Sequence, residues 1–205
     1  MSSVVKSRRE IYSEATRAAL LDEATTLFAE RGYAGTSLEE IASASQVTRG
    51  AVYHHFASKQ ALFEAVLSTQ ETQAIAGIMA AATADDPWDA ATLALDAYLD
   101  QCCDPVYGRL VWLEGPAALG WHRWRECEER YAYGLVERFI TALIEAGYLE
   151  DTAADSLARF TFWMLGGAGH TLAEAPEDDK PRLREEWRHL IRRAISSMRV
   201  GSDHS

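Results

Sequence analysis

Residues 36–63 read TSLEEIASASQVTRGAVYHHFASKQALF and contain several signals for the start of a helix. Thr36 and Ser37 each precede a glutamate by three residues, Glu39 and Glu40 respectively. In either register the hydroxyl can accept a backbone N–H while the carboxylate reaches back to the cap residue, which is the capping box that starts a helix. Apolar residues then recur at helical spacing for about two turns, so this helix is too short to be stable alone.

A second short helix follows a turn at Gln46 and Val47, because Thr48 can cap the residues that come next. Ser58 offers a cap for a third helix. The apolar side of the second helix consists of Ala51, Val52 and Phe56. Two short helices joined by a turn predict a helix-turn-helix, the motif that places its second helix in the major groove of DNA.

Residues around this motif resemble one protein family. The segments that carry the resemblance are AxxLFAERGYAGTS at 24–37, EEIA at 39–42 and VTRGAVYHHFASKQALF at 47–63. Residues 18–67, about a quarter of the chain, resemble the N-terminal domain of the TetR/AcrR family of bacterial transcription regulators. The resemblance implies an all-α protein, with a three-helix DNA-binding domain and a C-terminal helical bundle that binds a ligand and dimerises.

The same resemblance implies roles for individual residues. It implies contacts to DNA phosphates from Thr36, Thr48, Tyr53, His55 and Lys59, and contacts to bases from Arg49, Gly50 and His54. Polar and aromatic side chains suit both roles, and a lysine at a helix start adds to the partial positive charge there. Two alternatives stay open, since Tyr53 can be an aromatic at the rim of the core and His55 can pack beneath the helix.

Composition is that of an ordinary globular protein. The chain has 205 residues, of which 48% are hydrophobic and 25% charged, enough for one large or two modest domains. No run approaches the ~18 apolar residues of a membrane span, and no secretory segment follows the start, so a cytoplasmic protein without membrane contact is expected. Three cysteines without a CxxC spacing indicate reduced thiols.

The net charge of −11 looks unfavourable for binding DNA until the chain is divided. Residues 1–67 hold seven Lys/Arg and eight Asp/Glu, whereas residues 68–205 hold thirteen and twenty-three. The acidic excess therefore lies downstream of the helix-turn-helix. An acidic body disfavours indiscriminate binding to polyanions, so we expect weak non-specific binding and a salt-dependent specific complex.

Three segments are expected along the chain. Residues 1–15 form a flexible basic arm with Lys6, Arg8 and Arg9, which either reaches a minor groove or is a solvated tail. Residues 16–67 form the helix-turn-helix domain, in which a helix over 16–31 ends at Gly32. Residues 68–205 form the helical ligand-binding and dimerisation domain, which a helix from Ser58 to about Ala82 enters.

The second domain is predicted to contain only helices. Helical spacing of apolar residues predicts helices over 88–103, from 105 to about 114, and over 117–146, 152–175 and 180–199. The last two present apolar faces that suit a two-fold interface. The residues expected in the dimer interface are Leu157, Met164, Gly167, Trp187, Leu190, Ile191 and Ile195. A dimer can place two recognition helices about 34 to 36 Å apart on a palindromic double-stranded operator.

Large aromatic residues are frequent in this domain and suggest a pocket for a small apolar or aromatic effector, although core packing explains any one of them equally well. The candidate ligand-binding residues are Cys102, Trp112, Trp121, Trp124, Tyr131, Phe162 and Trp163. Cys102 and Cys103 are alternatively sensors of thiol-reactive compounds or soft metals. His122 and Glu126 lack the partner motif of a zinc site, and neither a metal nor a cofactor is expected.

Other classes of function fit less well. The sequence contains no GxSxG, GxxxxGK or HExxH motif, so no catalytic residues are assigned and an enzyme is not expected. A non-specific nucleoid protein is disfavoured by the acidic balance. The prediction is a homodimeric repressor that an effector releases from its operator, and the alternative is an orphan or activating regulator of the same fold.

Overall fold

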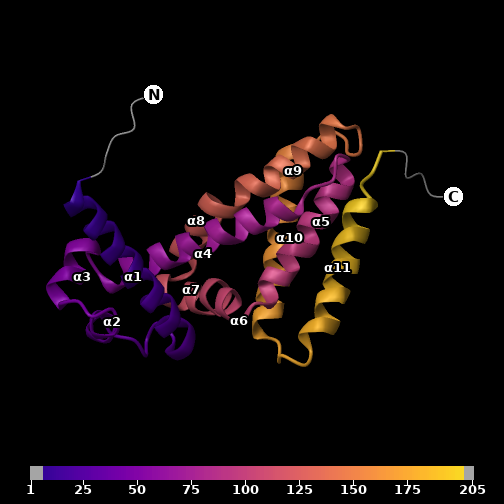
Figure 1. The fold of residues 1–205 in the computed structure, drawn as a ribbon. Helices are drawn as coiled ribbons and strands as arrows, with labels where there is room; N and C mark the ends of the chain where they lie inside the picture. Colours follow the sequence, from indigo (N-terminus) through magenta and orange to yellow (C-terminus); the bar gives the residue numbers. More distant parts are fainter. Residues whose placement is uncertain (1–6, 201–205) are drawn as a thin grey trace. The chain divides into compact units, whose positions relative to one another are not determined.

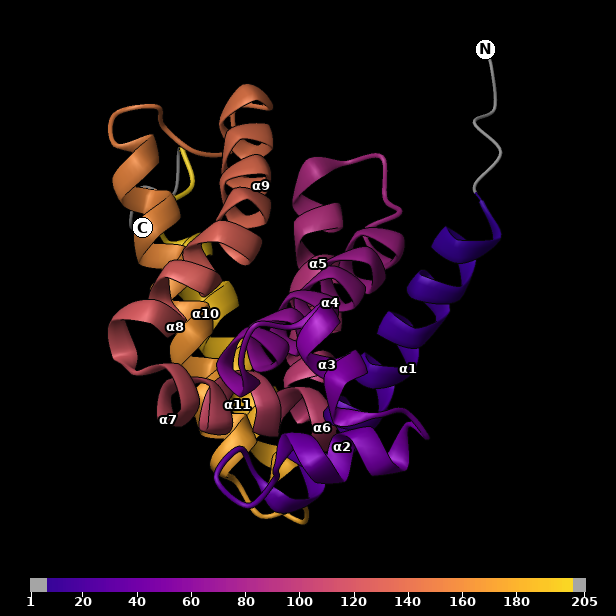
Figure 2. The same ribbon diagram turned by 90° about the vertical axis from the view of Figure 1, so that its left-hand side faces the viewer.

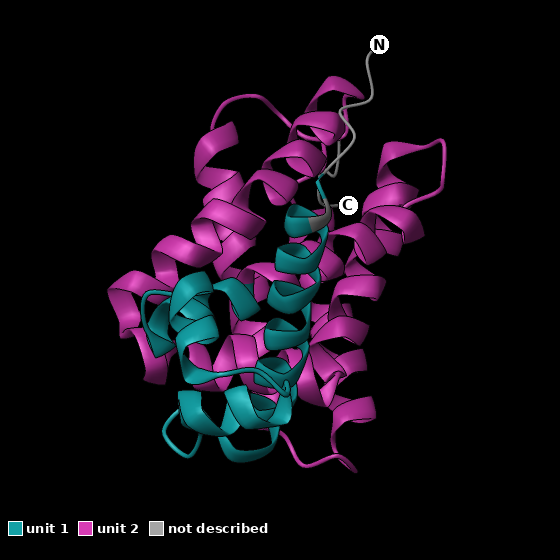
Figure 3. Ribbon diagram, turned by 60° about the vertical axis from the view of Figure 1, so that its left-hand side comes forward, with its two compact units in different colours: residues 1–67 teal, residues 68–205 magenta. Residues whose placement is uncertain are grey.

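The computed structural model describes residues 7–200, and every regular element within them is a helix. The all-α prediction is confirmed. The chain divides into two compact units, Met1–Leu67 and Ser68–Ser205, shown in different colours in Figure 3. None of the helices in the described residues has the length and apolar character needed to cross a membrane.

The first unit contains three helices and the start of a fourth, labelled in Figure 1: α1 (Arg8–Arg31), α2 (Leu38–Ala44), α3 (Arg49–His55) and the first turns of α4 (Lys59–Ala81). Side chains from all four are fully buried together: Leu20, Phe28, Ile41, Val52, Leu62 and Phe63. The unit thus has the small core that a helix-turn-helix needs, since α2 and α3 are too short to be stable alone.

The caps that start these helices follow the sequence pattern. Ser37 is the N-cap of α2, because its hydroxyl accepts from the Glu40 N–H while its own N–H donates to the Glu40 carboxylate. Thr48 caps α3 by accepting from the Ala51 N–H, and the Ser58 hydroxyl accepts from the Ala61 N–H at the start of α4. Of the two possible registers for α2, the structure has the one with Ser37 and Glu40.

The first helix starts earlier than expected. α1 begins at Arg8, not at residue 16, because Ser7 and Glu10 form a capping box that the sequence analysis missed. A flexible arm over 1–15 is therefore wrong for the helical residues 8–15. The rest of the expected arm, including Lys6, lies outside the described residues.

The second unit continues α4 and adds the long helix α5, a run of shorter elements, and then α9, α10 and α11. They are α5 (Pro87–Cys103), α6 (Pro105–Tyr107), the π-helix η1 (Gly108–Glu114), α7 (Gly115–Leu119), α8 (Trp121–Glu128), the π-helix η2 (Glu129–Tyr133), α9 (Gly134–Glu145), α10 (Ala154–Glu174) and α11 (Lys180–Ser196). Figure 1 shows α8 leading into α9 along one line.

One expected helix is interrupted. The pattern over 117–146 was predicted as a single helix, but Gly120 has φ of 75° and ends α7. A glycine adopts this conformation without the steric penalty that other residues meet, so the chain can change direction there. Gly147, with φ of 76°, lies just after the end of α9.

α10 is the central helix of the second unit. It packs against α5, η1, α9 and α11, and Figure 2 shows α9 and α10 next to each other. The Tyr98 hydroxyl on α5 donates to the Leu165 carbonyl of α10, 2.9 Å away. One face of α10 is therefore buried in the interior of the unit, from Ala158 to Leu172.

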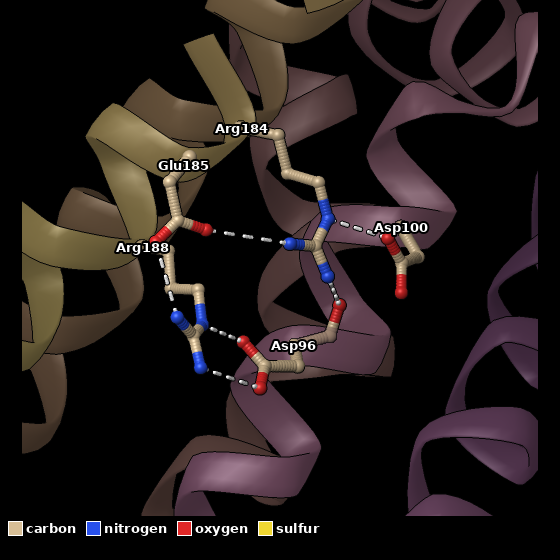
Figure 4. A network of polar contacts seen from close by, with 5 residues as sticks. All are labelled: Asp96, Asp100, Arg184, Glu185 and Arg188. Atoms are coloured by element: carbon tan, nitrogen blue, oxygen red, sulfur yellow. Dashed lines mark hydrogen bonds and ion pairs between the residues drawn. The ribbon is translucent and has the colours of Figure 1, made fainter. Parts of the chain in front are cut away.

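An ionic network holds α11 against α5 (Figure 4). The Arg188 guanidinium donates to both carboxylate oxygens of Asp96, from Nε at 2.6 Å and from Nη2 at 3.4 Å. Arg184 pairs with Asp100 and also donates to the Asp96 carbonyl. Glu185 lies between the two arginines on α11 and pairs with each. The network sets the position of the last helix relative to α5.

Candidate nucleic-acid interface and apolar cavity

α3 presents an exposed polar side that the core does not use. Arg49, Tyr53 and His54 are exposed, whereas Val52 is buried on the opposite side of the helix. Arg49 pairs with Glu39 at 2.7 Å and donates to the Tyr53 hydroxyl at 3.3 Å, with its guanidinium over the Tyr53 ring. These contacts hold a cation and a phenol together at the start of α3.

Gly50 is not required by the packing of the protein. A Cβ built at Gly50 meets only the Thr48 hydroxyl oxygen, at 3.8 Å, which is ordinary van der Waals contact. The backbone of the first turn of α3 is therefore open on this side. Another molecule can approach it closely.

His55 lies at the edge of the core. It is half-buried beside the exposed His54, with their rings 5.2 Å apart. Burial lowers the pKa of His55 from 6.5, and His54 and Arg17 lower it further, so His55 is neutral at pH 7. The alternative that His55 packs beneath the helix therefore agrees with its partial burial, although the side chain is not fully enclosed.

Thr36 has a structural role. It is only 2% exposed, and its hydroxyl donates to the Gly32 carbonyl at 2.9 Å and to the Leu27 carbonyl at 3.2 Å. The hydroxyl is enclosed and its proton is engaged at the end of α1, so this geometry gives the predicted phosphate contact no support and the contact stays a prediction.

Lys59 is also engaged within the first unit. Its ammonium donates to the carbonyls of Tyr33 at 2.6 Å and Thr36 at 2.7 Å, and it lies 4.2 Å from the centre of the Tyr33 ring. Two of its three N–H donors thus hold the loop after α1 to the start of α4. Lys59, Arg49 and Tyr53 also border one shallow polar depression over the loop before α2. A phosphate contact through the third donor stays a prediction.

The second unit encloses an apolar cavity of about 150 Å³. Its walls come from α4, α5, α6, η1, α8, η2, α9, α10 and α11. The apolar lining includes Ile75, Ile78, Trp88, Leu95, Trp112, Phe139, Phe162 and Ile195. An apolar cavity of roughly this volume accommodates a benzene-sized ligand in other proteins. The cavity can therefore hold about one aromatic ring.

Two of the seven predicted ligand residues, Trp112 and Phe162, line this cavity. Trp124 is buried in the core, where its indole donates to the Val111 carbonyl at 2.9 Å. Trp121, which is 55% exposed, and Trp163 stack on each other at the surface with ring centres 6.2 Å apart. Cys102, Trp121, Trp124, Tyr131 and Trp163 are not part of the cavity wall in this structure, because their helix faces pack elsewhere.

The sequence analysis missed the polar groups of the cavity, which include Glu71, Tyr98, Tyr107, Glu128 and Thr161. One signal was available: Leu67, Glu71, Ala74 and Ile78 follow the helical spacing of a buried stripe, so that glutamate interrupts an otherwise apolar face of α4. Burial raises the pKa of Glu71 to about 7, although a hydrogen bond from the Tyr107 hydroxyl opposes the shift. Burial and the neighbouring Glu71 raise the pKa of Glu128 as well.

Comparison with known proteins identifies the chain. Residues 20–66 match the family described as "Bacterial regulatory proteins, tetR family". Residues 88–198, more than half of the chain, match the family described as "Tetracyclin repressor-like, C-terminal domain". The chain belongs to the TetR family. It is a DNA-binding transcriptional regulator and not an enzyme.

Similar TetR-family proteins cover the whole fold. The transposon Tn10 TetC protein of Escherichia coli is 28% identical over 152 residues, which are 74% of this chain and 77% of that protein. The crystal structure of a TetR-family regulator from Pectobacterium atrosepticum is 28% identical, with a TM-score of 0.80 over 95% of this chain and 98% of that one. RolR in complex with resorcinol shares the fold, with 21% identity and a TM-score of 0.66 over 92% and 96% of the chains.

The expected TetR-family dimer residues fall into two groups. Leu190, which is 57% exposed, and the exposed Gly167 lie on the surface of α11 and α10, with Met164 and Trp187 half-buried. Ile191 is buried within the chain and, with Ile195, lines the cavity, so almost none of its surface is left for a second subunit. Leu157 packs on a core cluster of α9 and α10. Helical spacing identifies an apolar stripe, but it does not show which residues of that stripe pack within the chain and which are left for a second subunit.

The cysteines of this TetR-family chain are free, and Cys102 and Cys127 are buried. Burial raises the pKa of the Cys102 thiol well above its ordinary value of 9.0, which keeps it protonated and unreactive. Within the described residues no group of three or more His, Cys, Asp or Glu side chains could hold a metal ion.

Proposed function

We propose that this TetR-family regulator is a cytoplasmic homodimeric repressor that binds a palindromic operator and is released by a small apolar or aromatic effector. One observation carries the proposal. α4 is a single helix whose first residue, Lys59, holds the loop before α2, while its later residues Glu71, Ala74, Ile75 and Ile78 line the cavity. A ligand that moves α4 therefore acts on a helix that also carries the DNA-binding unit.

On the DNA side, α3 enters the major groove. Arg49 and His54 are proposed to read base edges, and the open backbone at Gly50 allows close approach to the DNA. Thr48, Tyr53 and His55 are proposed to contact phosphates and set the register of the helix. The lowered pKa of His55 in the free chain favours a neutral imidazole, which can donate a hydrogen bond to a phosphate.

Repression is relieved through coupled equilibria. The effector binds more tightly to a dimer whose recognition helices are wrongly spaced for the operator than to the DNA-bound dimer. Operator affinity then falls by that difference in free energy, typically about 1 to 3 kcal/mol. Reciprocity requires that operator DNA weaken effector binding by the same factor.

The test is the binding of purified protein to duplexes from the DNA upstream of its own coding region, compared with scrambled duplexes over a salt series. A saturable complex of one dimer per palindrome, with affinity that falls as salt rises, is expected. Equal weak binding to every duplex contradicts the proposal. An effector that tightens the operator complex indicates an activating or co-repressed regulator instead.

Arg49→Ala tests whether the Arg49 side chain contacts a base or a phosphate. Loss of a base contact is expected to weaken operator binding by about 1 to 3 kcal/mol and to relax specificity at one base pair. The control is Arg138→Ala, which removes an exposed arginine of α9 in the second unit. A loss that is equal on operator and scrambled DNA makes Arg49 a phosphate ligand.

A further inference from the structure

The cavity of the second unit contains two carboxyl groups that nothing in it neutralises. Glu71 and Glu128 both line the cavity and are 2% and 3% exposed. One oxygen of Glu71 accepts from the Tyr107 hydroxyl at 2.9 Å. Among residues 7–200, no lysine, arginine or histidine forms an ion pair with either carboxyl group. Their charges are therefore uncompensated whenever they ionise.

Two further polar atoms on the cavity wall have no partner. The hydroxyl oxygen of Thr161 on α10 and the indole nitrogen of Trp112 on η1 are buried without a hydrogen bond among the described residues. Both residues are more than nine-tenths buried. Buried polar groups without partners destabilise a fold, and each one in a native structure calls for an explanation. A bound ligand that forms a hydrogen bond with the Thr161 hydroxyl would be such an explanation.

The two enclosed carboxyl groups and the Thr161 hydroxyl can accept hydrogen bonds, so they favour a ligand that donates hydrogen bonds and carries positive charge. The Trp112 indole N–H is itself a donor and is not satisfied by such a ligand. Arg192 of α11 is the only basic residue on the described wall, and it is half-exposed, whereas both acids are fully enclosed. An anion would therefore meet two buried acids. A neutral apolar molecule would offer the carboxyl and hydroxyl oxygens no hydrogen-bond donor. A protonated amine has three N–H donors and a charge that offsets a carboxylate.

The walls suit the rest of such a ligand. Trp112, Phe139 and Phe162 present aromatic rings to a cavity of about 150 Å³. Aromatic faces attract organic cations, and the attraction is stronger where water is excluded. The volume allows about one ring beside the charged group.

We propose that the cavity binds an organic monocation, in which an aromatic body carries a protonated amine that the Glu71 and Glu128 carboxyl groups hold. This inference rests on the proposed effector-releasable function and names the chemical class of the effector. The positive charge of the ligand is the feature that the cavity selects.

The first experiment is isothermal titration calorimetry of the full-length protein, without DNA, with three probes that share one ring: benzylamine, benzyl alcohol and benzoate. Benzylamine is expected to bind about tenfold or more tightly than benzyl alcohol, which corresponds to the loss of one charged contact. Benzoate is expected not to bind. Equal binding of the alcohol, preference for benzoate, or no binding of benzylamine at millimolar concentration overturns the inference.

Two variants locate the binding site. Glu71→Gln and Glu128→Gln keep the shape and remove the charge, so each is expected to weaken benzylamine binding about tenfold or more and to leave benzyl alcohol unaffected. Because each also removes a buried acid that no basic side chain among the described residues neutralises, the melting temperature without ligand is expected to rise. Glu137→Gln, at an exposed position on α9, is the matched control and is expected to change neither quantity. Unchanged benzylamine binding by both variants overturns the inference.

The pH dependence separates a cation from a neutral ligand. The titratable and charged groups around the two acids are Tyr98, Cys102, Tyr107 and Arg192, and of these the thiol and both phenols stay protonated near pH 7 because burial raises the pKa of each. A bound ammonium displaces protons from the acids, so its affinity is expected to rise with pH through about 7. An affinity that falls with rising pH contradicts charge selection.

Failure of this inference and failure of the proposed function are distinguishable. The calorimetry measures binding to the protein alone, and operator release is measured separately in the duplex assay. Glutamate-dependent binding of benzylamine without operator release retains the site and rejects the proposed coupling. Operator release by neutral compounds alone retains the function and rejects the cation.

Discussion

At the scale of single residues, Gly50 lies in the first turn of α3, where no neighbouring atom of the protein requires a glycine. Gly50→Ala is expected to raise the free energy of unfolding by about 0.5 to 1 kcal/mol, because alanine favours the helix. It is also expected to weaken operator binding, because the methyl group points to the face that we propose approaches DNA. Urea unfolding and fluorescence anisotropy measure the two effects.

The control for this change is Gly134→Ala at the start of α9, where a Cβ also meets no atom within 4 Å. It is expected to stabilise the protein and to leave operator affinity unchanged. If Gly50→Ala binds the operator as well as the parent does, the DNA does not approach this turn closely.

Glu71 makes stability depend on pH. Its pKa is raised from 4.5 to about 7, so the folded chain retains a proton that the unfolded chain releases at lower pH. The free energy of unfolding therefore falls as pH rises from 4.5 to about 7, by on the order of 3 kcal/mol from this group.

Glu71→Gln is expected to remove that loss. The difference in unfolding free energy between variant and parent, from urea titrations across this pH range, is expected to grow in favour of the variant as pH rises. A constant difference shows that Glu71 titrates normally. Glu137→Gln again supplies the exposed control.

At the scale of helices, the position of α11 depends on its ionic network with α5. Asp96→Asn replaces a carboxylate that accepts two hydrogen bonds from the half-buried Arg188. The variant is expected to lose about 1 to 2 kcal/mol of unfolding free energy, because the pair is bidentate and partly shielded. Glu186→Gln, which breaks an exposed pair with Arg182 along α11, is expected to lose clearly less, because solvent screens that pair. If Asp96→Asn and Glu186→Gln lose the same unfolding free energy, the network does not hold α11 against α5 more strongly than an exposed ion pair does.

At the scale of the whole molecule, the proposed dimer places the exposed face of α10 and α11 against itself. Leu190→Glu is expected to convert the dimer into monomers in sedimentation velocity, because two buried carboxylates would face each other across the symmetry axis. Operator affinity should fall with it, since one recognition helix reads only half of a palindrome. The control is Leu93→Glu at a leucine of α5 that is 39% exposed. A Leu190→Glu protein that stays dimeric places the interface elsewhere.

Local signals were sufficient for most of the helices. The Ser37–Glu40 capping box and the Thr48 cap depend on residues three apart, so they could be recognised without knowing the rest of the fold. The same kind of signal at Ser7 and Glu10 was present and was overlooked, which is why α1 begins earlier than expected. The family also followed from spaced residues in the first 67 positions, because the helix-turn-helix is specified by nearby residues.

Only the tertiary structure decided what the buried side chains do. Periodicity shows that a helix has an apolar stripe, but which distant helix covers that stripe depends on packing. For this reason Ile191 faces the interior rather than a second subunit, and Trp121 lies at the surface rather than in the cavity. The cavity, with two enclosed acids, exists because α4 and α8 bring Glu71 and Glu128 to one space from positions far apart in the chain.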